Sequence, residues 1–442
     1  MIGIAISEPL FQQLLMLTRD DVERGAAVFL HYDSSGDRYL VHEIELALDG
    51  DCLDATATEI TLAPQFLSKV TRRARESGRH LGLLHTHPSG FPEFSATDDK
   101  TEARLADFLE MRNPGLISFA FVVCDETIRA RRIGTQELMP VCRVGATVGA
   151  LHACGAIAVA SDEQFDRQVR AFGEHGQAVL NQMTVAVVGL GGTGSLIAQQ
   201  LAHLGVGAFR LIDSDTIEST NLNRVVGAFP PSVGLLKVEV ARAMIRSVRP
   251  EAGIECFSGS VIDEESRRLL CGSDCIFICT DSHSSRAFVN ELAYQYLVPA
   301  FDMGVSISVQ DGRVTSVTGR VQMLAPSLPC LMCANAISPH AVREELMSEE
   351  ARQADPYFRG DGVKQPAVIS INSTAASLAV TMFLGAFTGV SAVARWQRYD
   401  ALTGTVRPMS TKALDTCGVC GTGGVTGLAD SRVLSFLPPG GQ

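Results

Sequence analysis

Apolar and polar positions follow two different patterns along the chain. Up to about residue 150, short β-like runs at 26–31, 39–48, 81–87 and 117–124 mix with helical stretches at 64–76 and 96–110, which predicts an α+β domain. From residue 162, strands and helices alternate, which predicts a parallel, doubly wound sheet. The small apolar run at 148–160 suits a junction. We therefore expect an α/β chain with domains at 1–155 and 162–420 and a flexible Gly- and Pro-containing tail at 421–442.

One segment, at 367–394, has no charged residue and is long enough to cross a membrane. It holds Asn372 and several Ser and Thr residues, and it lies inside the second expected domain. We interpret it as a buried core helix or dimer helix and expect no membrane span.

Composition narrows the class of partner. The 442 residues are 46% hydrophobic, enough for two or three domains with full cores. A net charge of −12 without a long Lys/Arg run weighs against nucleic-acid binding and favours proteins and small molecules as partners. The N-terminus lacks a basic region and a cleavage site, and four of the 12 cysteines form Cys-x-x-Cys pairs. We expect a cytoplasmic protein with thiols and metal rather than disulfides.

Metal-binding residue types gather where the strand predicted at 81–87 ends. His85 and His87 alternate there, so both imidazoles point the same way and can bind one metal ion. Asp98 can return from the following turn as a third ligand, which leaves a fourth tetrahedral position for water. This layout is typical of catalytic zinc. The alternative is a solvated turn in which Asp98 caps the next helix.

The spacing His-x-His, seven residues, Ser-x-x-Asp resembles the JAMM/MPN metalloproteases, which cut isopeptide or peptide bonds after ubiquitin-like proteins. The resemblance implies that Ser95 donates to the oxyanion. It also implies an upstream glutamate that takes a proton from the water at the zinc. The match is Glu23, although Glu43 and Glu45 also lie upstream.

A glycine-rich turn joins a buried strand to a helix in the second half of the chain. Asp213 ends the next strand, about 20 residues after the last glycine, where it suits a ribose hydroxyl. These features alone indicate a dinucleotide site and an NAD or FAD oxidoreductase. The glycines that let the backbone approach a phosphate are Gly189, Gly191, Gly192 and Gly194.

The residues after Asp213 favour a different chemistry. Together with the lead-in at 165–173, they resemble the ubiquitin-activating and ThiF/molybdopterin-synthase adenylyltransferase family over residues 162–420. The family adenylates a protein carboxylate with ATP and Mg²⁺, so anionic oxygens must be clamped while pyrophosphate leaves. The matching positions are Asp215, Asn221, Arg224, Lys237 and Asp281.

The resemblance assigns a role to most of these residues. It implies that Arg224 and Lys237 hold the phosphates, that Asn221 orients them and that Asp281 binds Mg²⁺. It further implies that Arg167 reaches the ATP of a partner subunit, as in dimeric members, so we expect a homodimer.

Two Cys-x-x-Cys pairs complete the resemblance: Cys330 with Cys333, and Cys417 with Cys420. Together they form a closed tetrahedral thiolate site typical of structural zinc, with a redox pair as the alternative. Family members that pass their protein on as a thioester carry a cysteine between such pairs, but residues 334–416 contain none.

The chain is thus interpreted as a zinc peptidase fused to an adenylating enzyme, both acting on a small ubiquitin-like protein with a C-terminal glycine. A conjugating enzyme or a sulfurtransferase is the expected further partner. The alternatives are sulfur-carrier activation in cysteine, thiamin or molybdopterin-type metabolism, a binding scaffold with inactive sites, and an NAD-dependent reductase. The expected cofactors are ATP, Mg²⁺ and two zinc ions, one catalytic and one structural.

Overall fold

The computed structural model describes residues 3–88, 90–152, 163–347 and 366–436. The chain divides into two compact units. The first is Met1–Ala156 with Gln295–Leu297 and Thr426–Arg432, and the second is Ile157–Tyr294, Val298–Val425 and Val433–Gln442.

The first unit is built on a mixed sheet of nine strands in the order β11-β10-β1-β3-β2-β6-β7-β8-β9. A separate hairpin of β4 and β5 accompanies it. The sheet strands are β1 (Gly3–Ser7), β2 (Gly25–Asp33), β3 (Arg38–Leu46), β6 (His80–Thr86), β7 (Ser118–Cys124), β8 (Thr127–Arg132), β9 (Leu138–Met139), β10 (Val141–Val144) and β11 (Val148–His152), and the hairpin strands are β4 (Cys52–Ala55) and β5 (Ile60–Leu62).

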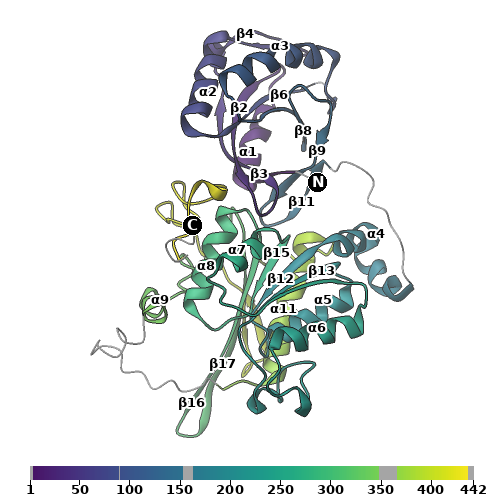
Figure 1. Ribbon diagram of the computed structural model, residues 1–442, viewed down its shortest axis with the longest axis vertical. Helices are drawn as coiled ribbons and strands as arrows, with labels where there is room; N and C mark the ends of the chain where they lie inside the picture. Colours follow the sequence, from purple (N-terminus) through teal and green to yellow (C-terminus); the bar gives the residue numbers. More distant parts are fainter. Residues whose placement is uncertain (1–2, 89, 153–162, 348–365, 437–442) are drawn as a thin grey trace. The chain divides into compact units, whose positions relative to one another are not determined.

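Helices cover both faces of this sheet (Figure 1). Helix α1 (Glu8–Leu17) buries Phe11 and Leu14 against one face, and α2 (Pro64–Ser77) and α3 (Ala96–Arg112) cover the other. Helix α2 begins with proline and ends at Gly78, whose φ of 65° only glycine adopts readily. The elements expected at 26–31, 39–48, 64–76, 81–87, 96–110 and 117–124 correspond to β2, β3, α2, β6, α3 and β7.

The second unit is a doubly wound sheet of eight strands in the order β14-β13-β12-β15-β16-β17-β18-β19. Strands β12 to β16 pair in parallel, and β17, β18 and β19 extend the sheet as antiparallel strands. The strands are β12 (Thr184–Val188), β13 (Ala208–Ile212), β14 (Gly253–Phe257), β15 (Cys275–Ile278), β16 (Ala300–Gln310), β17 (Arg313–Leu324), β18 (Trp396–Asp400) and β19 (Thr405–Pro408). The helices are α4 (Asp166–Gln182), α5 (Gly194–Leu204), α6 (Lys237–Val248), α7 (Glu264–Cys271), α8 (His283–Gln295), α9 (Pro339–Leu346) and α11 (Ile369–Phe387).

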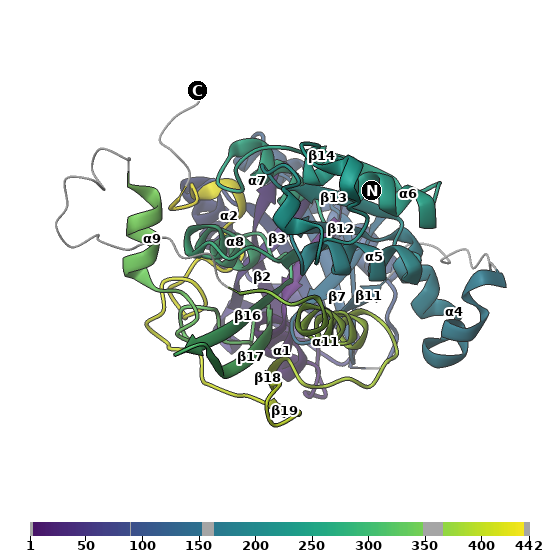
Figure 2. The same ribbon diagram turned by 90° about the horizontal axis from the view of Figure 1, so that it is seen from below.

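The uncharged segment at 367–394 contains α11, which packs on β16, β17 and α5 (Figure 2). Among the described residues, it is the one helix long and apolar enough to cross a membrane by length and composition. Half of its apolar window is buried inside the unit, and Asn372 is 5% exposed. This burial agrees with the interpretation as a core helix.

Two segments differ from the expected organisation. The first part of the expected junction is β11, which pairs with β10, while residues 153–160 lie outside the described residues. The expected flexible tail contains buried residues as far as Leu434: Val425, Ala429 and Leu434 are buried, and Ala429–Ser431 form a 3-10 turn. Residues 437–442 lie outside the described residues.

Candidate functional sites

Two histidines and an aspartate converge at the end of β6. His85 lies on β6, and His87 follows the strand with its backbone N–H donating to the carbonyl of Val123 on β7 (2.9 Å). Asp98 lies in the first turn of α3. His85 Nε2 is 3.1 Å from His87 Nε2 and 3.1 Å from Asp98 Oδ1.

These three side chains fit one zinc ion. Donor atoms bound to a tetrahedral zinc at its usual bond lengths of about 2.0–2.1 Å stand about 3.3 Å apart. His85 Nε2 lies 3.1 Å from both His87 Nε2 and Asp98 Oδ1, which is close to this value, and His87 Nε2 lies 3.8 Å from the other carboxylate oxygen, Asp98 Oδ2. His87 Nδ1 donates to the carbonyl of Phe91 (2.7 Å), which leaves the Nε2 lone pair for the metal.

Glu23 lies beside this cluster because of the pairing of β2 with β6. Gly25 pairs with His85, so the residues just before β2 reach the histidines. The Glu23 carboxylate is 3.9 Å from His87 Nε2 and is almost fully buried. Burial raises the pKa of Glu23 to about 7. A carboxylate with this pKa can both accept and return a proton near neutral pH.

The other two upstream glutamates bind cations elsewhere. Glu43 pairs with Arg73 (2.5 Å) and Arg79 (2.7 Å), and Glu45 pairs with Arg73 (2.5 Å) and with Lys69. Hydrogen bonds from these cations outweigh the effect of burial and lower the pKa of both carboxyls. The geometry therefore brings Glu23, and neither Glu43 nor Glu45, to the histidines.

Ser95 is the N-cap of α3. Its side chain accepts from the backbone N–H of Asp98 (3.2 Å), and its own N–H donates to Asp98 Oδ2 (2.5 Å). Asp98 thus belongs to the capping box of α3 and also lies next to the histidines. The helix-cap interpretation and the metal-ligand prediction are therefore compatible. The Ser95 hydroxyl hydrogen is not used in the capping bond.

Arg131 on β8 fixes the start of α3, although the sequence did not single it out. Its guanidinium pairs with Asp99 (2.7 Å) and Glu102 (2.7 Å) and lies 3.9 Å from the ring centroid of Phe94. These contacts hold the helix turn that presents Asp98. An arginine inside a strand pattern carries no sequence signal for this role.

The glycine-rich turn of the second unit runs from β12 into α5. Gly189 has a φ of 85°. A Cβ on Gly192 would lie 2.5 Å from the side-chain nitrogen of Asn372, and one on Gly194 would lie 1.8 Å from the carbonyl oxygen of Gly189. Gly194 therefore permits close packing of the helix on the turn and does not line the adjacent cavity, unlike Gly189, Gly191 and Gly192.

A cavity of about 710 Å³ lies at the carboxyl ends of the parallel strands, a size suited to a nucleotide. Asp213 accepts from the backbone N–H groups of Leu190 (2.6 Å) and Asp215 (2.8 Å). Lys237 Nζ lies 2.7 Å from the Asp215 carboxylate. The lining includes the predicted residues Asp213, Asp215, Asn221, Arg224, Lys237 and Asp281.

Arg167 does not line this cavity. It lies on α4 and is exposed. Its expected role involves the ATP of a partner subunit, so that role stays a prediction.

The structure adds two cavity residues to the predicted set. Asn372 comes from α11 and Arg286 from α8. Arg286 pairs with the fully buried Asp302 (3.1 Å), which also pairs with Arg320. The sequence shows Asn372 as a polar residue within an uncharged segment. Its position opposite Gly192 could not be predicted, because it depends on the packing of α11.

Glu345 of α9 holds the loop that carries Asp281. Its carboxylate accepts from the Ser282 hydroxyl (2.7 Å) and from the backbone N–H groups of His283 (2.9 Å) and Ser284 (2.7 Å). These bonds keep the carboxyl ionised by lowering its pKa against the effect of burial. Glu345 thereby ties the segment between the two cysteine pairs to the cavity edge.

The four paired cysteines come together in the second unit. The sulfur atoms of Cys330 and Cys417 are 3.6 Å apart, and those of Cys333 and Cys420 are 3.5 Å apart. All four sulfurs lie within 4.8 Å of one another. Thiolates at the usual Zn–S length of about 2.3 Å stand roughly 3.8 Å apart around a tetrahedral zinc, so the cluster fits that ion.

Comparisons with known proteins identify the family of each part of the chain. The model of the ThiF family matches residues 165–419, and the model described as prokaryotic homologs of the JAB domain matches residues 8–134. The chain belongs to the ThiF family and carries an N-terminal JAB domain, which confirms the class expected from the sequence.

Individual relatives cover the second unit. The chain is 32% identical to the molybdopterin-synthase adenylyltransferase of Salmonella typhimurium over 260 residues, which is 58% of this chain and 96% of that protein. It is 27% identical to the SAMP-activating enzyme E1 of Haloferax volcanii over 258 residues, 58% of this chain and 87% of that protein. Among solved structures, that of E. coli MccB with ATP is similar at 19% identity and a TM-score of 0.46, covering 59% of this chain and 75% of that one.

Proposed function

We propose that the ThiF domain adenylates the C-terminal carboxylate of a small ubiquitin-like or sulfur-carrier protein. The observation that carries the proposal is the convergence of Arg224, Lys237 and Asp281 with the glycine turn around one nucleotide-sized cavity. A hydride-transfer enzyme does not need this set of charged residues. The relatives named as an adenylyltransferase and as a SAMP-activating enzyme support the proposal.

The residues suit an in-line transfer at the α-phosphorus of ATP. One oxygen of the carrier carboxylate forms a bond to that phosphorus, the bond to the bridging oxygen breaks, and pyrophosphate leaves with the released electron pair. Arg224 and Lys237 neutralise the charge that grows on the leaving group. Asn221 orients the phosphates, and Asp213 receives the ribose.

Asp281 would hold a Mg²⁺ ion, which would neutralise phosphate charge when bound. Such ions are bound through one or two carboxylates together with phosphate oxygens. Asp281 lies at the cavity and is exposed to it, and Glu345 fixes its loop.

Exchange of labelled pyrophosphate into ATP tests the adenylation. The chain should catalyse exchange only when a carrier with a free C-terminal carboxylate and Mg²⁺ are present. Asp281→Ala should abolish exchange while leaving the fold intact. Full exchange in Asp281→Ala would remove this residue from the mechanism.

We propose further that the JAB domain is a zinc-dependent peptidase. His85, His87 and Asp98 would hold the ion, which supplies Lewis-acid activation of water and of the scissile carbonyl. Glu23 takes a proton at its carboxylate and returns it to the leaving nitrogen. Ser95 donates its hydroxyl hydrogen to the developing oxyanion. The placement of Glu23 at 3.9 Å from His87 Nε2 supports this assignment.

Both domains would act on the same carrier tail. The peptidase would expose or free a terminal glycine that the ThiF domain then adenylates. Because residues 334–416 contain no cysteine for a thioester, the acyl-adenylate would pass directly to an acceptor, with a sulfurtransferase favoured over a conjugating enzyme. We also propose that the four cysteines bind a structural zinc ion and that the protein acts in the cytoplasm. In the proposed homodimer, Arg167 reaches the ATP of the partner subunit.

A further inference from the structure

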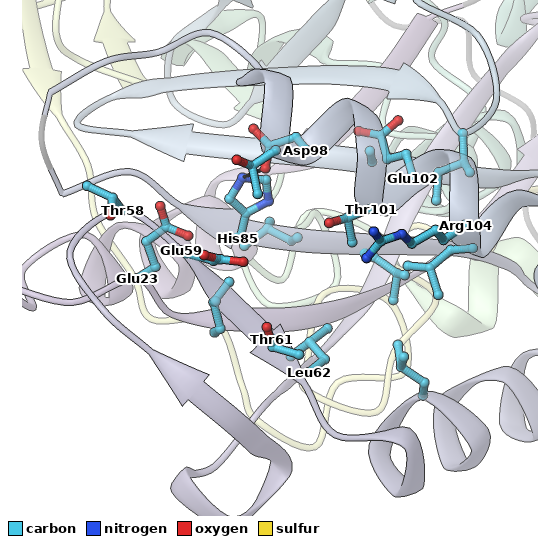
Figure 3. Close-up of a pocket in the computed structure, with 18 residues that line it drawn as sticks. Glu23, Thr58, Glu59, Thr61, Leu62, His85, Asp98, Thr101, Glu102 and Arg104 are labelled. Atoms are coloured by element: carbon cyan, nitrogen blue, oxygen red, sulfur yellow. Dashed lines mark ion pairs between the residues drawn. The ribbon is translucent and has the colours of Figure 1, made fainter.

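A second cavity opens beside the histidine cluster of the first unit (Figure 3). It lies between the β4–β5 hairpin on one side and α3 on the other, over β6 and β7. The hairpin sits close to β2, since a Cβ on Gly25 would lie 2.8 Å from the Leu62 side chain. The volume of the cavity is about 280 Å³. Small-molecule sites begin at about 300 Å³, so this cavity suits a single side chain better than a larger ligand.

The deep walls of the cavity are apolar. Leu62 and Leu67 come from the hairpin and α2, Leu105 comes from α3, and Leu83 and Ala120 come from the sheet. Leu83 is 9% exposed and Ala120 is 4% exposed, so they form a floor within the packed core. Burial of an apolar group against these preformed walls would be favourable, because it removes apolar surface from water.

Three residues of the proposed peptidase site lie at the cavity. Glu23, His85 and Asp98 all line it. In Figure 3, Glu23 and Glu59 lie on one side of His85, and Thr101 and Arg104 lie on the other. A substrate bond placed at His85 and Asp98 therefore has the apolar cavity directly next to it.

We propose that this cavity binds the aliphatic or aromatic side chain of the residue that follows the scissile bond. The inference rests on the proposed peptidase function and on a carrier that ends in glycine. Glycine has no side chain to fill the cavity, and the other residue joined to the scissile bond is the first one on the leaving-group side. The preferred substrates are linear precursors of the form Gly-X with X apolar, rather than isopeptides whose leaving group is a lysine ε-amine.

The apolar walls, rather than the charged lining residues, set the preference for X. Exposed charges of both signs line the cavity, Glu59 from the hairpin and Arg104 from α3, so they give no net bias towards an acidic or a basic X. Burial of a Leu or Phe side chain in such a cavity corresponds to about 10- to 100-fold in kcat/KM over a residue that cannot use it.

The test uses the full-length, zinc-loaded chain and a ubiquitin-like carrier whose C-terminal glycine is extended by peptides with X as Leu, Phe, Ala or Asp. A conjugate of the same carrier to a lysine side chain serves as the isopeptide substrate. The expected kcat/KM is about 10- to 100-fold higher for Leu and Phe than for Asp. It should also be higher for these linear extensions than for the isopeptide.

A pair of variants on α3 checks the cavity itself. Thr101 is exposed and lines the cavity, so the Phe side chain in Thr101→Phe should fill the cavity. The kcat/KM for the substrate with X as Leu should then fall to the value for the substrate with X as Ala. Lys100 is exposed on the same helix and does not line the cavity, so Lys100→Phe is the matched control and should retain the preference.

A binding measurement separates failure of the cavity from failure of the peptidase. Labelled peptides Gly-Gly-Leu and Gly-Gly-Asp are titrated against the full-length Glu23→Gln variant. Preference for Leu without any cleavage by the unsubstituted chain would uphold the cavity and overturn the peptidase. A kcat/KM that does not depend on X, or that is at least as high for the isopeptide, would overturn the proposed role of the cavity. Binding that does not discriminate between the two peptides would overturn it as well.

Discussion

Replacing Glu23 with glutamine should separate catalysis from metal binding in the JAB domain. Gln keeps the shape of the side chain but cannot take up a proton. His85, His87 and Asp98 remain to hold zinc, so the zinc content should not change. The cleavage rate should fall by about 10² to 10⁴, the usual contribution of a general acid-base group.

The same change should alter stability with a definite pH dependence. Burial raises the pKa of Glu23 from its ordinary 4.5 to about 7 in the metal-free chain. Below pH 4.5 the carboxyl is protonated in the folded and unfolded states alike, so it adds no penalty. Above pH 7 the carboxyl is ionised in both states. Each unit by which the pKa is raised corresponds to about 1.36 kcal/mol, so ionisation of Glu23 in the folded state costs roughly 3 kcal/mol. Metal-free Glu23→Gln should therefore be up to this much more stable than the unsubstituted chain above pH 7, with the difference vanishing below pH 4.5.

The assay is cleavage of an extended carrier, run beside zinc analysis and denaturant unfolding of the metal-free chain at pH 4.5 and pH 8. Glu43→Gln is the matched control, because Glu43 pairs with Arg73 and Arg79 away from the histidines. It should cleave normally and lose no more than about 1 kcal/mol for each partly exposed pair. Normal cleavage by Glu23→Gln together with loss of cleavage in Glu43→Gln would refute the assignment.

Three further outcomes follow from the same contacts. The chain should hold about two zinc ions, and His85→Ala with His87→Ala should reduce this to about one by elemental analysis; an unchanged content would argue against the histidine site. Glu345→Gln should raise the KM for ATP several-fold with little change in the fold, since it weakens the anchor of the Asp281 loop; an unaltered KM would limit Glu345 to a structural role. Arg131→Met should lower the unfolding free energy of the first unit by about 3–5 kcal/mol, because Glu102 is left buried and unpaired; a loss below 1 kcal/mol in denaturant unfolding would contradict this.

The sequence predicted the elements that carry strong periodicity and the residues that lie close together in the chain. His85 and His87 share a strand end, and the glycine turn of the second unit is continuous, so both could be placed before the fold was known. The choice of Glu23 over Glu43 and Glu45 rested on resemblance alone. Only the β2–β6 register, with Gly25 opposite His85, shows why Glu23 reaches the cluster.

Residues whose role depends on tertiary packing were not predicted. Arg131, Glu345 and Asn372 reach their sites from strands or helices far away in the sequence. The apolar cavity beside His85 likewise arises where the β4–β5 hairpin meets α3. The composition of the C-terminal segment suggested a flexible tail, but Val425 and Leu434 in it are buried.

The most direct measurement of the central claim is the intact mass of a candidate carrier after incubation with the chain, ATP and Mg²⁺. We expect a carrier with AMP attached to its C-terminal carboxylate, and no such adduct when that carboxylate is blocked by an amide. Release of ADP and phosphate without a carrier adduct, or an equal adduct on the blocked carrier, would contradict adenylation of the terminal carboxylate.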